Sequence, residues 1–356
     1  MTTTPEKSTP PAPGSATRVC IAGLTRAGLA HATVLATLPG CELAGASDPR
    51  TAPRRTLRGM GHAAPSYPRF DKLLARETPV AVIVAAPQGE RAAIIQTALE
   101  AGAAVLTEPP LAPTLAEAEA LVALASARGL RLAVSQPIAY QPVFARARDA
   151  MRAGAIGAAR QARASLYLSR IFSPRDLRRL GGPLAGGVIA HHALDLIAML
   201  NELFGQPSEV EASWRCLHGA VEDELHAMMK LASGAEVGLD ASWSVPGHPR
   251  AATVIEIQGE SGSLLVSDDA LELDLPAPCA GFSQGQTRLR DGDLPQPARF
   301  DLEGESRWLE DAAFLAWLAG GPPPPGEAAA AVGAQRVMEA CYASARLGGN
   351  AVRVSA

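Results

Sequence analysis

Residues 18–30, RVCIAGLTRAGLA, decide the fold, because a short apolar run passes into a helix-like pattern across the turn Gly23-Leu24-Thr25-Arg26-Ala27-Gly28. This turn keeps the first and last glycines of a Gly-x-Gly-x-x-Gly loop and carries Thr25 at the middle position. The first glycine of such a loop permits a tight turn, the last permits close helix–strand packing, and the middle one lets backbone approach a pyrophosphate. The segment predicts the first strand, turn and helix of a nucleotide-binding fold, with a purely structural turn as the alternative.

The residues that follow support a nucleotide site. Asp48 ends the second apolar run, about 20–25 residues after the turn, where an acid can accept hydrogen bonds from the adenosine ribose. Arg50 comes next, and a guanidinium matches the geometry of a 2′-phosphate. Asp48 favours NAD and Arg50 favours NADP, so both stay open; an Asp48 that only caps the next turn is the alternative. The cofactor contacts predicted here are Gly23, Thr25, Arg26, Ala27, Gly28, Asp48 and Arg50, with the Thr25 hydroxyl facing a phosphate.

Apolar runs alternate with helix-like stretches up to residue 140, as in β-α-β units around a parallel sheet. Predicted strands cover residues 19–22, 42–47, 81–85, 104–106 and 131–135, and predicted helices cover residues 29–38, 91–101 and 115–128. A further helix ends at residue 154, after which the pattern alternates residue by residue. It predicts strands at residues 160–168, 209–217, 224–231, 236–243, 253–258 and 263–266, with Gly259-Glu260-Ser261-Gly262 as a hairpin turn.

These patterns predict an α/β protein of two domains. Residues 17–140 form a Rossmann domain with a doubly wound parallel sheet, and residues 141–356 form an α+β domain with a large, open, mainly antiparallel sheet for substrate binding and oligomerisation. The chain ends with helices at residues 307–319 and 327–346 and a strand at residues 351–354, and the C-terminal helix can pack back on the first domain. Residues 276–297 are expected to be a loop, and residues 1–16 a disordered tail.

The composition limits the functions of the chain. Apolar residues make up 47% of the 356 residues, and the net charge of −4 comes without a basic block. No apolar run reaches the roughly 18–20 residues of a membrane span. Five cysteines without a Cys-x-x-Cys pair predict reduced thiols and no metal site. We expect a cytoplasmic protein that binds a small-molecule substrate and neither a membrane nor nucleic acid.

Several further segments form a recognisable order. They are Val84-Ala85-Ala86-Pro87, residues 98–112 with Thr107-Glu108-Pro109-Pro110, the turn at residues 151–157, Gly186-Gly187 leading to His192-Ala193-Leu194-Asp195, and residues 256–263. Together they make residues 18–356 resemble the glucose-fructose oxidoreductase/inositol dehydrogenase (Gfo/Idh/MocA) family. The resemblance implies NAD or NADP as cofactor, with Ala86, Pro87 and Glu108 beside it.

The chain departs from the family's pattern at the acid–base residues. In that family Glu-Lys-Pro follows the fourth strand, and its lysine commonly binds nicotinamide and substrate and assists proton transfer; here Pro109 takes the lysine's position. The Asn and His often found after the third strand's proline appear as Gln88 and Arg91. The aspartate commonly found four residues before the catalytic histidine appears as Val188.

A histidine suits the remaining chemistry, since its pKa allows it to take a hydroxyl proton near neutral pH. His191 and His192 are adjacent, and we expect their rings to point in different directions. His192 is the better catalytic candidate because Asp195 can orient it from the same helix face. There are two alternatives: His192 only forms hydrogen bonds to backbone, or His191 is the catalytic histidine in its place. The resemblance places Tyr140, Tyr167, Arg170, His191 and Trp243 around the substrate, although each also suits packing or surface roles.

The leading hypothesis is an NAD(P)-dependent oxidoreductase acting on a small hydroxylated, ketone, imine or cyclic substrate. A non-redox or catalytically silent nucleotide-binding protein is the alternative, because of Thr25, Pro109 and Val188. A scaffold with an empty nucleotide cleft is a third. We also predict a homodimer or homotetramer through the sheet of residues 160–270, because Trp214, Trp243 and the Val/Leu-rich strands offer more apolar surface than one helix layer covers.

Overall fold

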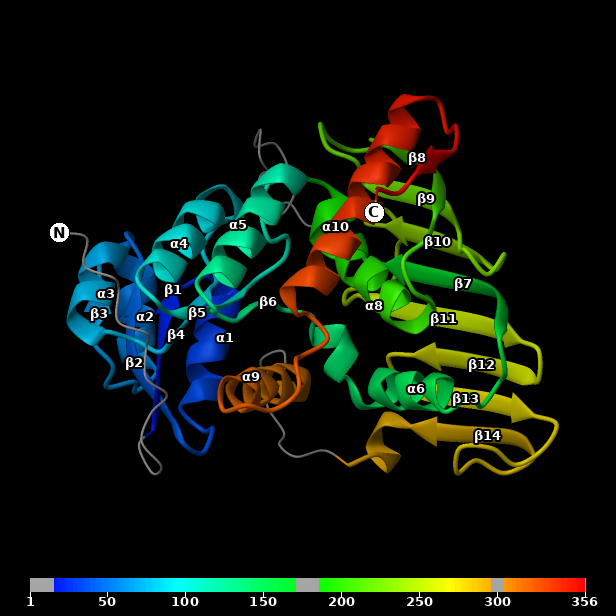
Figure 1. Cartoon of the computed structure of the whole chain (residues 1–356), viewed down its shortest axis with the longest axis horizontal. Coiled ribbons are helices and arrows are strands. Elements are labelled where there is room, and N and C mark those ends of the chain that lie inside the picture. The colour runs from blue at the N-terminus through cyan, green and yellow to red at the C-terminus, as the bar shows by residue number, and fades with distance from the viewer. Residues whose placement is uncertain (1–15, 171–185, 296–303, 356) are drawn as a thin grey trace. The chain divides into compact units, whose positions relative to one another are not determined.

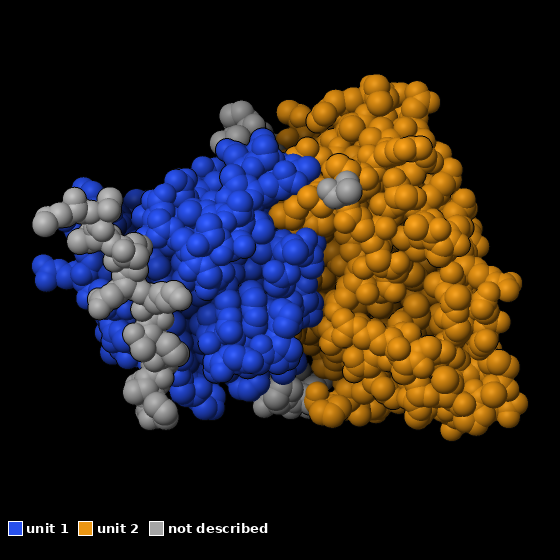
Figure 2. Space-filling view, viewed as in Figure 1, with its two compact units in different colours: residues 1–135, 298–331 blue, residues 136–297, 332–356 orange. Residues whose placement is uncertain are grey.

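The computed structural model describes residues 16–170, 186–295 and 304–355, and the chain divides into two compact units (Figure 2). Unit 1 comprises residues 1–135 and 298–331, and unit 2 comprises residues 136–297 and 332–356. The tail predicted at residues 1–16 lies outside the described residues, apart from Ala16. None of the helices in the described ranges is long and apolar enough to cross a membrane.

Unit 1 is built on a six-stranded parallel sheet of order β3-β2-β1-β4-β5-β6, which confirms the predicted Rossmann sheet. The strand order reverses between β1 and β4, the point where doubly wound sheets bind ligands. Helix α1 packs against α9, and α4 packs against α5 (Figure 1). The strands are β1 (Thr17–Ala22), β2 (Cys41–Ser47), β3 (Ser66–Tyr67), β4 (Ala81–Val84), β5 (Ala104–Thr107) and β6 (Leu132–Val134). The helices are α1 (Arg26–Leu35), α2 (Thr51–Gly59), α3 (Phe70–Glu77), α4 (Gln88–Glu100), α5 (Leu115–Ala127) and α9 (Gly304–Leu318).

Strand β1 shows why this sheet forms. Val19 and Ile21 belong to the core that contains α1 and α9, whereas Cys20 packs with Leu73 of α3. Successive strand residues point to opposite faces, so a strand covered on both faces is apolar throughout. The prediction missed α2, α3 and the short β3. Each of the two helices is short and has a single buried residue, Leu57 or Leu73, so each has few apolar residues from which to predict a helix.

Unit 2 is built on a nine-stranded sheet of order β14-β13-β12-β11-β7-β10-β9-β8-β15, in which only β7 and β10 pair in parallel, so the predicted mainly antiparallel sheet is confirmed. Gly259 pairs with Gly262, as the hairpin prediction requires. The strands are β7 (Ala159–Tyr167), β8 (Glu209–Arg215), β9 (Glu224–Lys230), β10 (Glu236–Ser242), β11 (Ala252–Gly259), β12 (Gly262–Ser267), β13 (Ala270–Leu275), β14 (Gly285–Arg290) and β15 (Val352–Arg353). The helices are η1 (Pro137–Tyr140), α6 (Pro142–Arg152), η3 (Ile189–Ala193), α8 (Leu194–Phe204), η4 (Asp291–Asp293) and α10 (Ala328–Arg346).

Helices α6, α8 and α10 cover one face of this sheet, and the other face is open (Figure 1). In β9, Leu225 and Met229 face the helices while His226 and Met228 are exposed. Trp243 is 0% exposed, whereas Trp214 is 37% and Met228 38% exposed. Of the two tryptophans behind the oligomerisation argument, only Trp214 is therefore at the surface, and oligomerisation stays a prediction. The loop predicted at residues 276–297 is also wrong in part, because it contains β14.

Candidate nucleotide-binding and catalytic sites

The glycine turn of unit 1 lies directly against the loop that follows β4. Gly23 has φ 91°, and a Cβ on it would lie 2.4 Å from the Cα of Ala86. A Cβ on Gly28 would lie 2.1 Å from the carbonyl oxygen of Gly23. Both positions therefore require glycine, the first for conformation and contact and the second for packing of α1 on the turn.

Thr25 caps α1 and uses its hydroxyl inside the protein. Its Oγ1 donates to the carbonyl oxygen of Ala85 at 2.8 Å and accepts from the N–H of Gly28 at 3.4 Å. The hydroxyl proton is thus engaged. A pyrophosphate at this turn would instead meet the first-turn N–H groups of α1, at Arg26 and Ala27, where a helix favours anions.

Asp48, directly after β2, joins the same edge of the sheet. Its carboxylate accepts from the N–H of Leu24 at 2.9 Å and from the N–H and Nε of Arg50, each at 2.9 Å. Burial raises the pKa of Asp48, but the hydrogen bonds from Arg50 and Leu24 outweigh burial and hold it below its usual value. Asp48 therefore caps the following turn and also ties it to the glycine turn, next to where an adenosine ribose would lie.

Glu108, directly after β5, belongs to a buried charged cluster that reaches α9. Oε1 of Glu108 accepts from Nη1 of Arg307 at 2.8 Å and lies 3.2 Å from Nε2 of His31. Nδ1 of His31 lies 2.8 Å from Oδ1 of Asp311, and Oγ of Ser135 donates to Glu310 at 2.7 Å. Of the charged members, Glu108 is the most exposed, at 19% of its side chain. The cluster fastens α9 to α1 and to the loop after β5.

The members of this cluster set each other's protonation. Burial alone lowers the pKa of His31, but the carboxylates of Asp311 and Glu108 raise it to about 9 against the opposing charge of Arg307. Burial raises the pKa of Glu108, yet Arg307 and His31 hold it well below its usual range. Burial also raises the pKa of Glu310, to about 7. Although His31, Glu310 and Asp311 have their ligand atoms within 4.8 Å of one another, Arg307 already places a cation there.

In unit 2, two parallel strands bring a second group of residues together. Tyr167 at the end of β7 pairs with Ser242 at the end of β10, so Arg170 and Trp243 both follow at one edge of the sheet. The guanidinium carbon of Arg170 lies 4.6 Å from the centroid of the Trp243 ring. The ring of Tyr167 contacts His248, with centroids 5.8 Å apart.

His191 and His192 stand on the π-helical turn η3, and π-turns are frequent at functional sites. Both rings lie beside Trp243, with centroids 6.0 and 5.6 Å from that of the indole and interplanar angles of 33° and 90°. Nε1 of Trp243 donates to Nδ1 of His192 at 3.2 Å. Burial, Arg170 and His191 together lower the pKa of His192 to about 3.

The structure thus brings Arg170, His191, His192 and Trp243 into one group. Asp195 lies in the first turn of α8, and Tyr140 ends η1. The contact of His192 that defines its orientation is the one to Trp243, and a role for Asp195 stays a prediction.

Two family matches cover most of the chain. Residues 17–136 match the oxidoreductase family with an NAD-binding Rossmann fold, and residues 144–265 match the GFO/IDH/MocA C-terminal domain. The chain belongs to the GFO/IDH/MocA oxidoreductase family. Its first domain is the NAD-binding Rossmann domain of that family.

Characterised members are distant from this one. The D-apiose dehydrogenase of Paraburkholderia graminis is 27% identical over 183 residues, which are 49% of this chain and 48% of that protein. The 1-carboxy-3-chloro-3,4-dihydroxycyclohexa-1,5-diene dehydrogenase of Comamonas testosteroni is 28% identical over 162 residues, 45% of this chain and 41% of that protein. These matches span less than half of either relative.

Solved structures share the fold over the whole chain. GenD2 from gentamicin A biosynthesis, in complex with NAD, has a TM-score of 0.79 at 24% identity and covers 100% of both chains. Levoglucosan dehydrogenase in complex with NADH and levoglucosan has a TM-score of 0.84 at 21% identity, covering 96% of this chain and 100% of that one.

This GFO/IDH/MocA protein holds the loop after β5 with an arginine that the sequence pattern did not single out as functional. Nε of Arg91 donates to the carbonyl oxygen of Ala86 at 2.9 Å, and its Nη1 donates to that of Glu108 at 2.8 Å. Nη1 also contacts the carbonyl oxygen of Pro109. Arg91 therefore links the loops after β4 and β5, next to the position where the family resemblance puts a lysine. Because its partners are backbone carbonyl oxygens, which every residue type has, no residue pattern in the sequence signals this role.

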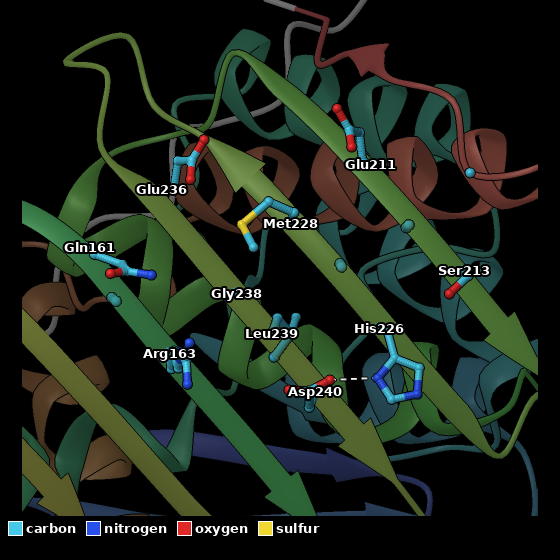
Figure 3. Close-up of a pocket in the computed structure, with 14 residues that line it drawn as sticks. Gln161, Arg163, Glu211, Ser213, His226, Met228, Glu236, Gly238, Leu239 and Asp240 are labelled. Atoms are coloured by element: carbon cyan, nitrogen blue, oxygen red, sulfur yellow. Dashed lines mark hydrogen bonds and ion pairs between the residues drawn. The ribbon is translucent and has the colours of Figure 1, made fainter.

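A pocket on the open face of unit 2 was also not predicted (Figure 3). It has a volume of about 480 Å³, and it lies between β7, β8, β9 and β10. Nδ1 of His226 pairs with Asp240 at 2.5 Å along its wall. The remaining labelled residues of the wall are mostly polar or charged: Gln161, Arg163, Glu211, Ser213, Met228, Glu236, Gly238 and Leu239.

Proposed function

We propose that this protein is an NAD-dependent oxidoreductase that moves a hydride between nicotinamide and a small hydroxylated, ketone, imine or cyclic substrate. The observation that carries this proposal is the group of Arg170, His191, His192 and Trp243 in unit 2. In the described part of the chain, Nε2 of His192 has no hydrogen-bond partner, while Nδ1 is occupied by Trp243. A ring held at one nitrogen and open at the other suits contact with a reacting oxygen.

The remaining residues of this group support substrate binding. The Arg170 guanidinium suits a carboxylate or phosphate of the substrate. Trp243 is fully buried, so it supports the two histidine rings and the arginine from beneath. The relatives named as a D-apiose dehydrogenase and as a cyclic diene dehydrogenase favour a polyhydroxylated or cyclic substrate.

For the cofactor we favour NAD over NADP. Gly23 and Gly28 have no room for side chains, so they keep the tight turn and the close helix packing of a dinucleotide-binding loop. The Asp48 carboxylate would repel the 2′-phosphate of NADP. It can still accept hydrogen bonds from the ribose hydroxyls of NAD, because each carboxylate oxygen can accept more than one hydrogen bond. Bound nicotinamide would supply the hydride acceptor or donor. Calorimetry should show tighter binding of NAD⁺ than NADP⁺; the reverse order would favour Arg50 as a 2′-phosphate ligand.

Mass analysis of small molecules released from the purified protein tests the function most directly. We expect NAD(H), followed by oxidation of NADH or reduction of NAD⁺ when carbonyl or hydroxyl substrates are added. A protein that binds neither NAD(H) nor NADP(H) at millimolar concentration would exclude the proposal.

A catalytically silent nucleotide-binding protein is the second candidate. Pro109 at the lysine's position favours it, because proline has no ionisable group and no backbone donor. The discriminating variant is Pro109→Lys. Activity that appears only in this variant would favour the silent protein, whereas turnover in the unmodified chain favours the enzyme.

We also propose that the protein is a homodimer or homotetramer that associates through the open face of the nine-stranded sheet. That face carries both charges: Arg163 pairs in register with the acidic Glu256 on one side, and the acidic Glu211 lies beyond Gly238 and Met228 on the other. Two copies related by a two-fold axis can match such charges. Sedimentation should give a mass above 36.8 kDa that falls at high salt; a monomer at micromolar concentration in low salt would exclude this.

The odd number of cysteines and their wide spacing support a cytoplasmic location.

A further inference from the structure

The hydrogen bond between Trp243 and His192 determines where the imidazole carries its proton. An indole N–H can only donate, so Nδ1 of His192, 3.2 Å away, must accept. A neutral imidazole whose Nδ1 accepts carries its single proton on Nε2. His192 therefore presents an N–H donor, and no lone pair, at its open nitrogen.

Hydrogen bonds anchor the backbone of Trp243 and the backbone just before the turn that carries His192. The N–H of Trp243 donates to the carbonyl oxygen of Asp223 at 2.8 Å, and the N–H of Val188 donates to that of Glu222 at 2.8 Å. The Glu222 carboxylate also accepts from the N–H of Gly187 at 2.8 Å. Adjacent residues of one turn thus anchor the backbone of Trp243 and the entry to η3.

The aromatic contacts agree with this arrangement. The ring planes of His192 and Trp243 meet at 90°, and the indole lies under the Arg170 guanidinium. Trp243 is fully buried, so its N–H would lose a partner if the His192 ring turned away. An unsatisfied buried donor is unfavourable, so the observed orientation of the ring is the more stable one.

The charged and titratable groups nearest to His192 also keep it neutral. Arg170, following β7, and His191, on the same turn, both oppose a second proton. Asp195, in the first turn of α8, is the acidic residue closest in sequence. Burial is the largest cause, and with Arg170 and His191 it lowers the pKa of His192 to about 3. Near pH 7 the ring carries one proton.

We propose that Trp243 is a positioning residue that fixes His192 as the Nε2–H tautomer, so that His192 acts on a carbonyl substrate as a hydrogen-bond donor rather than as a base. The catalytic part of this inference rests on the proposed oxidoreductase function. Reduced nicotinamide, when bound, would supply the hydride to the carbonyl carbon, and the C=O π pair would then move to oxygen. His192 Nε2–H stabilises the developing alkoxide and keeps its own proton. The alkoxide then takes a proton from solvent water.

The tautomer can be measured without any activity, by two-bond ¹H–¹⁵N correlation on protein labelled at histidine. We expect the His192 signal, identified by its loss in His192→Asn, to show protonated Nε2 and unprotonated Nδ1 at neutral pH. Trp243→Phe should give a mixture of tautomers. Trp214→Phe is the matched control, because Trp214 is 37% exposed at the end of β8, and should leave the signal unchanged. A protonated Nδ1 or an imidazolium in the unmodified protein at pH 7 would overturn the proposal.

Activity distinguishes a donor from a base. We expect His192→Gln, which retains an N–H donor, to keep more turnover than His192→Ala, and kcat to show no titration of a histidine between pH 6 and 8. Trp243→Phe should lower kcat by about 2–10-fold, the worth of one hydrogen bond, and introduce a pH-dependent limb. Equal losses in His192→Gln and His192→Ala, with a histidine titration in the unmodified enzyme, would establish a base instead. If no substrate reacts, the proposed function fails while the NMR measurement still decides the tautomer.

Discussion

His31 in unit 1 and His192 in unit 2 are each close to an arginine, but their pKa values are shifted in opposite directions. Burial lowers the pKa of both rings. Around His31, two carboxylates outweigh burial and Arg307, and the pKa rises to about 9. Around His192, an indole N–H occupies one nitrogen and the nearby charges are cationic, so the pKa falls to about 3.

The difference separates a structural from a chemical role. His31 is 0% exposed, and its ring nitrogens contact Asp311 and Glu108 within unit 1, so it joins α1 to α9. Nε2 of His192 has no hydrogen-bond partner among the described residues, which is why we assign the chemical role to His192. Burial and a neighbouring arginine are therefore poor guides to function, whereas the hydrogen-bond partner of each ring nitrogen separates the two.

The largest expected effect concerns turnover. His192→Ala should lower kcat by about 10²–10⁴-fold, a range that covers loss of an oxyanion donor and of an acid–base group. NAD affinity should change little, because the glycine turn and Asp48 lie in unit 1. His226→Ala, on the open face, is the matched control in steady-state assays. Turnover of His192→Ala close to that of the unmodified enzyme would remove the distinction between the two histidines.

The next effect concerns the stability of unit 1. Arg307→Met leaves Glu108, Glu310 and Asp311 without their guanidinium, and removal of one partner of a buried ion pair costs about 3–5 kcal/mol. Denaturant unfolding followed by the fluorescence of Trp308 and Trp317 on α9 measures the loss. The control is Arg69→Met, because Arg69 pairs with Asp71 on the surface and should change little. Equal stability of both variants would contradict a structural role for the cluster.

The opposite pKa shifts predict opposite dependences of stability on pH. The folded-state pKa of His31 is raised from 6.5 to about 9, so its contribution to the free energy of unfolding is complete below pH 6.5 and is lost as the pH rises to 9. The folded-state pKa of His192 is lowered from 6.5 to about 3. Below pH 6.5 the unfolded chain therefore binds a proton at this histidine that the folded protein does not bind, and the free energy of unfolding falls with the pH. Each slope is at most about 1.4 kcal/mol per pH unit.

Unfolding curves of His31→Gln and His192→Gln measured against pH separate the two contributions. His31→Gln should lack the loss of stability at alkaline pH and keep the loss at acidic pH. His192→Gln should lack the loss at acidic pH and keep the loss at alkaline pH. Parallel pH curves for the two variants would show that the histidines share one environment after all.

The sequence predicted the two sheets because their strands bury apolar side chains in a regular pattern. It failed where that signal is weak. Strand β14 is an edge strand without a fully buried residue, and exposed Gln286, Arg288 and Arg290 alternate with half-buried neighbours. The sequence of a polar edge strand between Pro-rich segments resembles that of a loop.

The candidate site was predictable only as far as short-range patterns extend. The glycine turn and Asp48 follow from their places after strands. By contrast, Arg307 meets Glu108 across 199 positions, and Trp243 meets His192 across 51. Nothing in local spacing announces such pairs. The π-turn that carries His191 and His192 also leaves no periodic signal, so their shared contact with Trp243 could not be predicted.

The smallest effect expected is that of Asp195→Asn. Asp195 was proposed as the residue that orients His192 from one turn along the helix, but the Trp243 N–H at 3.2 Å from Nδ1 already sets the direction of the ring and its tautomer. A second orienting contact would add at most the net value of one hydrogen bond, about 0.5–1.5 kcal/mol. Because 1.4 kcal/mol corresponds to tenfold in rate, kcat should fall by about 2–10-fold while KM for NAD⁺ stays constant.

The double variant Asp195→Asn/Trp243→Phe tests whether Asp195 and Trp243 act on the same ring. If Asp195 and Trp243 both hold the His192 ring, the fall in kcat of the double variant should exceed the product of the falls in the two single variants, because the ring keeps some order while either contact remains. A loss in Asp195→Asn alone as large as that in His192→Ala would show that the carboxylate, and not the indole, controls His192.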